Sequence, residues 1–398
     1  MPSIPVQFSD DEWVFLLQNR GFSERVLNAL KNGKGALSQV VVMLDVNDAA
    51  EVASYVAMVM THTKNPSDRH KFGQILDNID AAFDYTQDTP APPQHSPVNQ
   101  GLKDMLESQE FASKEDMDKA VQDYQDTYNN TPQDELCGFS PNQTSQMLNS
   151  QMDMPDCALK LNHDLTLKDL AAIPFFQNAR TFLRLMEEAE EVKATKKLGN
   201  LNRKFVEQLL EASIIDNQEW EMMHRHNKVI NEEDYLEGHI IRLVYEIAGL
   251  IKKRKDVFSI TKKGSQYRTD RYACALFTSI FQAHFCKLNL GYMDGYPDFP
   301  GIQQTLTFSL AAIKQKPDKW MKFADFTKDV LLTAVTDNIL YQNPSEDMAR
   351  LCDTRILRHL KRFGLLEAEF HAEHKYWSDP ERYRKTPLFD KFIRLEFQ

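Results

Sequence analysis

The fold is constrained most by a predicted amphipathic helix that is followed directly by a basic segment with the pattern of β-strands. Between residues 235 and 250, apolar side chains recur at the spacing of an amphipathic helix. The segment 250–271, LIKKRKDVFSITKKGSQYRTDR, follows at once and is typical of two short strands joined by a basic turn. A helix followed by a positively charged hairpin is the layout of a winged helix, a relative of the helix-turn-helix. We therefore expect a winged-helix-like unit here.

The charge of this segment opposes that of the whole chain. The formal net charge is −11, yet only Asp256 and Asp270 oppose the cations between residues 250 and 271. Clustered lysines and arginines neutralise phosphates, so the hairpin is a candidate nucleic-acid contact. The alternative is a solvated hairpin whose charges keep an exposed edge from pairing with another chain. The cations are Lys252, Lys253, Arg254, Lys255, Lys262, Lys263, Arg268 and Arg271.

The residues before the hairpin supply the other elements of such a unit. The pattern predicts a helix over 178–189, a strand over 192–195, a turn at Gly199 and a second helix capped by Asn200. The third helix, over 235–250, is expected to expose Glu237, Arg242 and Glu246. This mixture of charges is poorly suited to reading bases in a major groove.

The same order of elements recurs towards the C-terminus. Helices are predicted over 272–288, 302–314 and 323–340, then a helix that ends at Gly364, a strand over 365–370 and a second wing strand after residue 380. On the helix before Gly364, Arg355, Arg358 and Arg362 lie on one face. These arginines are a second candidate nucleic-acid contact, or a docking surface for an acidic protein. An ordinary solvated helix face is the alternative.

Four segments follow from this pattern. We predict a small N-terminal α/β unit over 1–85, an acidic, Pro-containing linker over 86–135, and a winged-helix-like domain over 136–271. A second helical domain is predicted over 272–398, and the order of its elements indicates a second winged helix. In the first unit, Ser23 should cap a helix over 24–31, Gly33 should have a positive φ, and a strand should cover 37–44. Two further helices should begin after Asn47 and at Pro66. The fold class is mostly α with short β-hairpins.

Composition and motifs exclude several classes of protein. Apolar content of 42% and charged content of 26% are ordinary for a soluble globular chain. The sequence has no signal peptide and no apolar run long enough to span a membrane, and its five cysteines form no CxxC pair, so we expect reduced thiols and a cytoplasmic location. No histidine or cysteine pair has a partner pair at zinc-site spacing, and phosphate-loop, dinucleotide and hydrolase motifs are missing. We predict no metal, no cofactor and no catalytic residues.

Three motifs mark the region from residue 135 onward: Gly138–Phe139–Ser140–Pro141, Asn178–Ala179–Arg180, and the turn from Lys193–Ala194–Thr195 to Gly199–Asn200–Leu201. In these motifs the region resembles a segment of uncharacterised bacterial hypothetical proteins. The resemblance implies a bacterial origin and no assigned activity, so it assigns no site residues.

Three hypotheses about function follow. The first is a non-enzymatic protein with a regulatory role that contacts nucleic acid, double-stranded DNA in particular, through basic wing and helix surfaces. The second is a protein–protein adaptor that uses winged-helix units to dock an acidic partner, because the fold alone does not fix the function. The third is an enzyme whose site is assembled from residues distant in the sequence.

Overall fold

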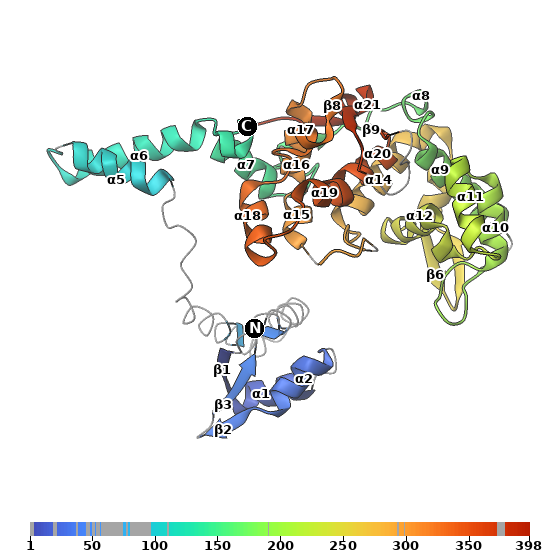
Figure 1. The fold of residues 1–398 in the computed structure, drawn as a ribbon, viewed down its shortest axis with the longest axis horizontal. Coiled ribbons are helices and arrows are strands. Elements are labelled where there is room, and N and C mark those ends of the chain that lie inside the picture. Colours follow the sequence, from blue (N-terminus) through green and yellow to red (C-terminus); the bar gives the residue numbers. More distant parts are fainter. Residues whose placement is uncertain are drawn as a thin grey trace. The chain divides into compact units, whose positions relative to one another are not determined.

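The computed structural model divides the chain into two compact units, Met1–Met117 and Asp118–Gln398 (Figure 1). The structure describes residues 4–18, 22–36, 39–44, 48–49, 52, 56, 75–76, 79, 97–109, 111–189, 191–292, 294–297, 299–371 and 379–398. Helices predominate and the strands form small antiparallel sheets, which confirms the mostly α fold class. Among the described helices, none is both long enough and apolar enough to cross a membrane.

The N-terminal unit contains a three-stranded antiparallel sheet in the order β1–β3–β2. Its elements are β1 (Ile4–Ser9), α1 (Asp10–Gln18), α2 (Glu24–Lys31), β2 (Lys34–Ala36) and β3 (Gln39–Leu44). Val6 and Phe8 on β1, and Val40 and Val42 on β3, alternate towards a buried core. Ser23 caps α2 as predicted, because its Oγ accepts a hydrogen bond from the backbone N–H of Val26.

Gly33 corrects one prediction for this unit. It is not among the residues with positive φ, and α2 ends at Asn32 with φ −86°. A glycine is required for space instead, since a Cβ at position 33 would lie 2.8 Å from Cγ1 of Val40. The helices predicted after Asn47 and at Pro66 lie mostly outside the described residues, of which 48–49, 52, 56, 75–76 and 79 are helical.

Two helices occupy much of the segment predicted to be a linker. They are α5 (Pro97–Ser108) and α6 (Lys114–Asn130). The helix predicted around residues 114–124 is therefore present, and it continues to Asn130. No side chain of α6 is buried, so its acidic residues lie along a solvated helix.

The second unit begins with a first series of elements that ends in the predicted hairpin. Ser140 and Gln143 form a capping box at the start of the first α-helix of this series. Strands β5, β7 and β6 form an antiparallel sheet in that order. The series is η1 (Asp134–Leu136), α7 (Pro141–Leu148), β4 (Leu159–Leu161), α8 (Leu167–Leu170), α9 (Pro174–Glu188), β5 (Val192–Lys193), α10 (Arg203–Ala212), α11 (Asn217–His226), η2 (Glu232–Asp234), α12 (Leu236–Ile247), β6 (Ile251–Arg254) and β7 (Val257–Ile260).

Two details of this series differ from the prediction. The N-cap of α10 is Asn202, whose Oδ1 accepts a hydrogen bond from Phe205 N at 3.1 Å, whereas Asn200 belongs to the preceding turn. The helix α11 is not predicted by the sequence pattern, because its polar composition gives no clear apolar stripe.

A second series repeats the arrangement. Strands β8, β10 and β9 form an antiparallel sheet, so the strand that precedes the helices again pairs with the last strand. Gly364, with φ 70°, follows the helical run at its predicted position. The elements are α13 (Lys262–Tyr267), η3 (Asp270–Tyr272), α14 (Ala273–Cys286), α15 (Pro300–Gln304), α16 (Leu306–Gln315), β8 (Met321–Lys322), α17 (Phe323–Thr327), α18 (Thr333–Gln342), α19 (Met348–Cys352), the π-helical η4 (Asp353–Leu357), α20 (Arg358–Arg362), β9 (Leu366–Glu369) and β10 (Arg382–Lys385).

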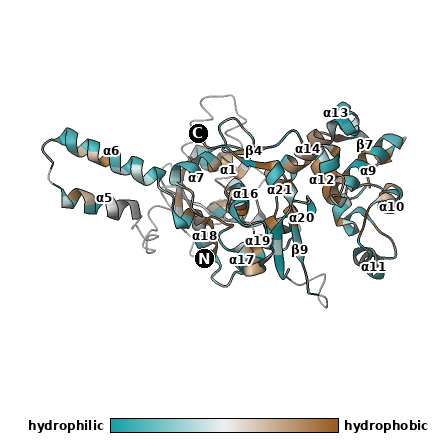
Figure 2. Ribbon diagram, turned by 90° about the horizontal axis from the view of Figure 1, so that it is seen from above, coloured by the Kyte–Doolittle hydropathy of each residue, from teal (hydrophilic) through white to brown (hydrophobic). Residues whose placement is uncertain are grey.

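One hydrophobic core joins the two series. The helix α14 is apolar on most sides and buried, and Phe277 on it packs edge-on against Phe176, Phe363 and Phe392. Figure 2 shows brown, apolar ribbon in α12, α14 and α16, whereas α6 is mostly teal. After α21 (Pro387–Phe392), β11 (Ile393–Leu395) pairs with β4. Buried residues from both sides of the boundary predicted between residues 271 and 272 belong to this one core.

Candidate nucleic-acid interface

The β6–β7 hairpin presents cations on the solvent face of its sheet. Lys255 and Asp256 form its turn and have φ values of 49° and 59°, as in a two-residue type I′ turn. The register pairs Lys252 with Ser259, Lys253 with Phe258, and Arg254 with Val257. The side chains of two paired residues point to the same face of the sheet, and successive side chains along a strand point to opposite faces. Lys253 therefore lies on the side of buried Phe258, and Lys252 and Arg254 lie on the opposite, exposed side.

The environments of these cations differ accordingly. Lys252, Arg254 and Lys255 are exposed, and within the described ranges none of them forms an ion pair. The Nζ of Lys253 donates a hydrogen bond to the carbonyl of Gly199 at 3.1 Å and lies 5.6 Å from the centre of the Phe258 ring. Lys253 therefore fixes a neighbouring loop, while the other three are available to a ligand.

The loop between β5 and α10 brings further cations to the hairpin. Ala194 N donates to the carbonyl of Asp256 at 2.7 Å, and Figure 1 shows the green loop beside the yellow hairpin. Lys196 and Lys197 on this loop are exposed. Lys193 faces solvent with Val257 and lies 3.2 Å from Glu191. We call the combined surface the basic edge; it consists of Lys193, Lys196, Lys197, Lys252, Arg254 and Lys255.

Lys196 and Lys197 are not among the cations predicted from the sequence to contact nucleic acid. The run KATKKLGN was a usable signal, since two lysines precede a predicted turn. Their relevance depends on the pairing of β5 with β7, which brings two distant segments together. Sequence spacing does not reveal that pairing.

Four of the eight cations lie outside the hairpin, in contrast to the prediction, and one of them, Arg271, lies exposed in η3. Lys262 and Lys263 are in the first turn of α13, which Thr261 caps through a hydrogen bond from Gly264 N. Lys262 is exposed, whereas Nζ of Lys263 donates to the Ala248 carbonyl at 3.1 Å. Arg268 follows α13 and forms an ion pair with Glu187. Strand β7 ends at Ile260, and the next residue, Thr261, caps a helix instead of continuing the strand.

The helix before the hairpin, α12, is largely buried. Arg242, expected at the surface, is 8% exposed; its Nε lies 2.7 Å from Glu232, and its Nη1 lies 2.7 Å from Glu246. His239 Nδ1 also lies 2.7 Å from Glu232, which in addition accepts a hydrogen bond from Leu201 N. Burial acts to raise the pKa of Glu232, but the hydrogen bond with His239 and the charge of Arg242 outweigh it and lower the pKa. The helix therefore lacks an exposed charged face for reading bases.

The second candidate surface is exposed only in part, because the side chain of Arg358 is 51% exposed while Arg355 and Arg362 are covered. Arg355 is 3% exposed, forms an ion pair with Asp294, and donates to the Pro297 carbonyl at 2.8 Å. Arg358 Nε donates to the buried carboxylate of Asp353 at 2.6 Å. Arg362 is half-buried, and this burial lowers its pKa despite the charges of two nearby glutamates. Arg355 and Arg358 each pair with a buried carboxylate, that of Asp294 or of Asp353, so the three arginines do not form one exposed cationic face.

Two histidines that are far apart in the sequence, His284 and His359, lie side by side in the fold. His284 Nε2 lies 2.9 Å from His359 Nδ1. Burial lowers the pKa of His359 to about 3 and that of His284 well below its ordinary value, so both rings are neutral at physiological pH. Within the described part of the chain, no three His, Cys, Asp or Glu side chains are grouped to hold a metal ion.

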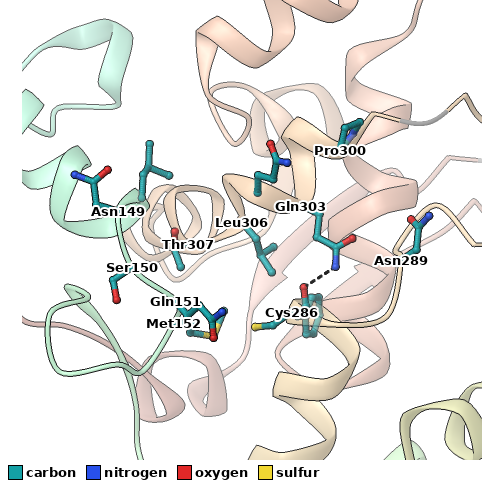
Figure 3. A pocket seen from close by; sticks show the side chains of 13 residues that line it. Asn149, Ser150, Gln151, Met152, Cys286, Asn289, Pro300, Gln303, Leu306 and Thr307 are labelled. Carbon is teal, nitrogen blue, oxygen red and sulfur yellow. Dashed lines mark hydrogen bonds between the residues drawn. The ribbon is translucent and has the colours of Figure 1, made fainter. Parts of the chain in front are cut away.

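A cavity of about 630 Å³ opens between the loop after α7 and the helices α14, α15 and α16 (Figure 3). Its walls carry amides, hydroxyls and apolar groups, and no carboxylate or histidine. Gln303 Nε2 is already engaged, because it donates to the carbonyls of Phe285 and Leu288 at 3.0 and 2.8 Å. The lining residues are Leu148, Asn149, Ser150, Gln151, Met152, Phe285, Cys286, Asn289, Pro300, Gln303, Gln304, Leu306 and Thr307.

Part of the chain matches a known protein family. Residues 171–273 match the Y4jL N-terminal domain family, an uncharacterised family, which agrees with the resemblance noted in the sequence. The matched range begins just before α9 and ends at the start of α14, so it contains the basic edge. No curated protein and no solved structure matches the chain.

Proposed function

We propose that this chain is a non-enzymatic protein that contacts double-stranded DNA through the basic edge. The observation that carries the proposal is the segregation of charge. Six cations from two adjacent elements face solvent together, while the chain has a net charge of −11. In the described part of the chain, only Lys193 among the six forms an ion pair. Cations left unneutralised in this way attract a polyanion.

The order of elements supports a winged-helix architecture for this region. Helix α9, strand β5, helices α10 to α12 and the β6–β7 hairpin follow one another as in a winged helix. The β5–β7 pairing closes the sheet against the helices. The second series, with the sheet order β8–β10–β9, supports a second unit of the same kind. In that unit, Arg382 and Arg384 on β10 pair with Glu369 and Glu367, so its hairpin is neutralised.

The contact that we propose is with phosphates rather than with base edges. Base readout in a major groove needs a helix whose polar side chains reach the bases. In α12 the candidate Arg242 is committed to Glu232 and Glu246. Lysines on a hairpin and a loop position a protein on the backbone and carry little sequence information. We therefore infer weak sequence preference. The free thiols of all five cysteines fit the cytoplasmic location that we also propose.

The test is DNA binding by a variant that lacks part of the basic edge. The variant combines Lys196→Gln, Lys197→Gln, Lys252→Gln and Lys255→Gln, and a matched control removes four exposed lysines elsewhere. At 50 mM salt, we expect the variant to bind a 25-base-pair duplex at least about 100-fold more weakly than the wild type, because each lost phosphate contact removes counterion release. The control should bind within about threefold of the wild type. Equal binding by all three proteins would contradict the proposal. The control substitutions are Lys168→Gln, Lys287→Gln, Lys322→Gln and Lys328→Gln.

A protein–protein adaptor is the second proposal, favoured by apolar side chains exposed around α11. Ile214, Trp220 and Leu236 are 56%, 38% and 40% exposed. The side chain of Asn178 forms hydrogen bonds with the backbone of Ile214 and with the carboxylate of Glu237. Because Glu237 follows Leu236 in the chain, Asn178 brings Ile214 and Leu236 near each other. Exposed tryptophan is a frequent anchor of protein interfaces. A stoichiometric partner that co-purifies with the wild type and is lost in Trp220→Ala would favour this role, and co-purified DNA alone would oppose it.

A further inference from the structure

The tip of the β5–α10 loop presents an apolar side chain among the cations of the basic edge. Leu198 is 62% exposed and directly follows Lys196 and Lys197. A single exposed leucine is common on protein surfaces and needs no explanation by itself. The position of this one does matter, because a ligand held by the surrounding lysines would meet it first.

The loop is held rigidly from several sides. Thr195 N donates to the Asn200 carbonyl at 2.7 Å, and Gly199 N donates to the Thr195 carbonyl at 2.9 Å. Gly199 has φ 70°, and a Cβ on it would lie 2.6 Å from Nζ of Lys253, so the turn requires glycine. Asn200 Nδ2 also donates to Glu233 at 2.7 Å. The backbone that carries Leu198 is therefore held by hydrogen bonds within the turn and to Glu233.

The base of the loop is tied to the hairpin and to the buried network behind it. Ala194 bonds to the hairpin turn at Asp256, and Leu201 N donates to Glu232. An apolar group that enters DNA must resist being pushed back, because opening a base step costs a few kcal/mol. These anchors on both sides of the loop supply that resistance.

We propose that Leu198 acts as a wedge that enters a base step from the minor groove and bends the duplex bound by the basic edge. Proteins that bend DNA from this groove combine cations for the backbone with an apolar side chain that partly unstacks two base pairs. Here Lys196 and Lys197 adjoin the apolar tip, and Lys252 and Lys255 on the hairpin extend the positive surface. This inference rests on the proposed DNA contact and adds that the bound duplex is bent.

The experiment measures binding and bending separately on the full chain. A duplex of 25 base pairs carries a donor and an acceptor dye at its two ends, and energy transfer is recorded at saturating protein in 50 mM salt. The wild type should raise the transfer, because bends of about 20–90° bring the ends together. Leu198→Ala should bind the duplex with an affinity within about tenfold of the wild type but should not increase the energy transfer. Leu198→Phe should still increase the energy transfer. Met154→Ala, which removes another exposed apolar side chain, is the matched control and should behave as the wild type.

Each other outcome overturns the inference. If the wild type and Leu198→Ala saturate the duplex with equal transfer, the wedge is wrong while the phosphate contact stands. If the wild type does not bind the duplex at all, both the wedge and the proposed function fail. If Leu198→Ala instead abolishes binding to vesicles of anionic phospholipid and leaves transfer unchanged, the loop inserts into lipid and not into DNA.

Discussion

The buried carboxylate of Glu232 should be among the most sensitive positions in the second unit. Its side chain is 1% exposed and accepts hydrogen bonds from Leu201 N and from Arg242 Nε, with His239 Nδ1 at 2.7 Å. In Glu232→Ala, the guanidinium of Arg242 remains 8% exposed and loses one of its two carboxylates. Leaving such a charge buried costs about 3–5 kcal/mol. The substitution also releases the base of the β5–α10 loop.

Urea unfolding followed by circular dichroism measures the effect. With a slope near 3 kcal/mol per M of urea for a domain of this size, the midpoint should fall by about 1–1.7 M. Glu233→Ala is the matched control, because that neighbouring carboxylate is exposed and bonds only to Asn200 among the described residues. It should shift the midpoint by less than about 0.3 M. Equal shifts for the two variants would refute the claim that the network stabilises this unit.

The pH dependence provides an independent check on Glu232. The folded protein lowers the pKa of this carboxyl below its ordinary value of 4.5. Its contribution to the free energy of unfolding is therefore complete above pH 4.5 and is lost as the pH falls through the lowered pKa. The difference in stability between wild type and Glu232→Ala should be constant from pH 6 to 8 and shrink below about pH 4.5. A difference that grows in acid would contradict this assignment.

Three further predictions concern packing and thiol chemistry. Gly264→Ala should destabilise the fold by more than about 2 kcal/mol, because a Cβ at this position would lie 2.1 Å from the carbonyl oxygen of Leu250. Gly249→Ala should cost only about 1–2 kcal/mol, because Gly249 has a φ of 68° but open space around it. Thermal unfolding of the two variants distinguishes these costs. Tyr383→Phe removes the hydroxyl that donates to buried Asp353 at 2.6 Å and should cost about 1–3 kcal/mol in urea unfolding, so an unchanged midpoint would show that bond to be dispensable. Burial, assisted by the charge of Asp329, raises the pKa of Cys137 to about 11. Its alkylation by iodoacetamide, followed by mass spectrometry, should therefore accelerate about tenfold per pH unit from pH 7 to 9, and a plateau near pH 8 would refute the raised pKa.

Local signals in the sequence predicted much of the fold. Ser23 marks a helix start, Gly199 and Gly364 mark turns with positive φ, and the alternation in 251–260 marks the hairpin. Such features depend on residues close together in the chain, so periodicity and capping chemistry reveal them.

The errors concern contacts between distant segments. Arg242 and Arg355 look exposed on a helical projection, yet carboxylates of Glu232 and Asp294 neutralise them in the interior. The sequence cannot show which carboxylate will meet which arginine. Lys196 likewise belongs to the basic edge only because β5 pairs with β7, which brings its loop beside the hairpin. Half of the candidate site was therefore predictable, and the part assembled by tertiary pairing was not.

The salt dependence of duplex binding tests the central claim most directly. If the six cations of the basic edge each neutralise one phosphate, a plot of log Kobs against log salt for the wild type should have a slope of roughly −5. Binding would then weaken by about 10³-fold between 50 and 200 mM salt. A slope between zero and about −1, with affinity retained at 200 mM salt, would show that these lysines and Arg254 do not hold the backbone of DNA.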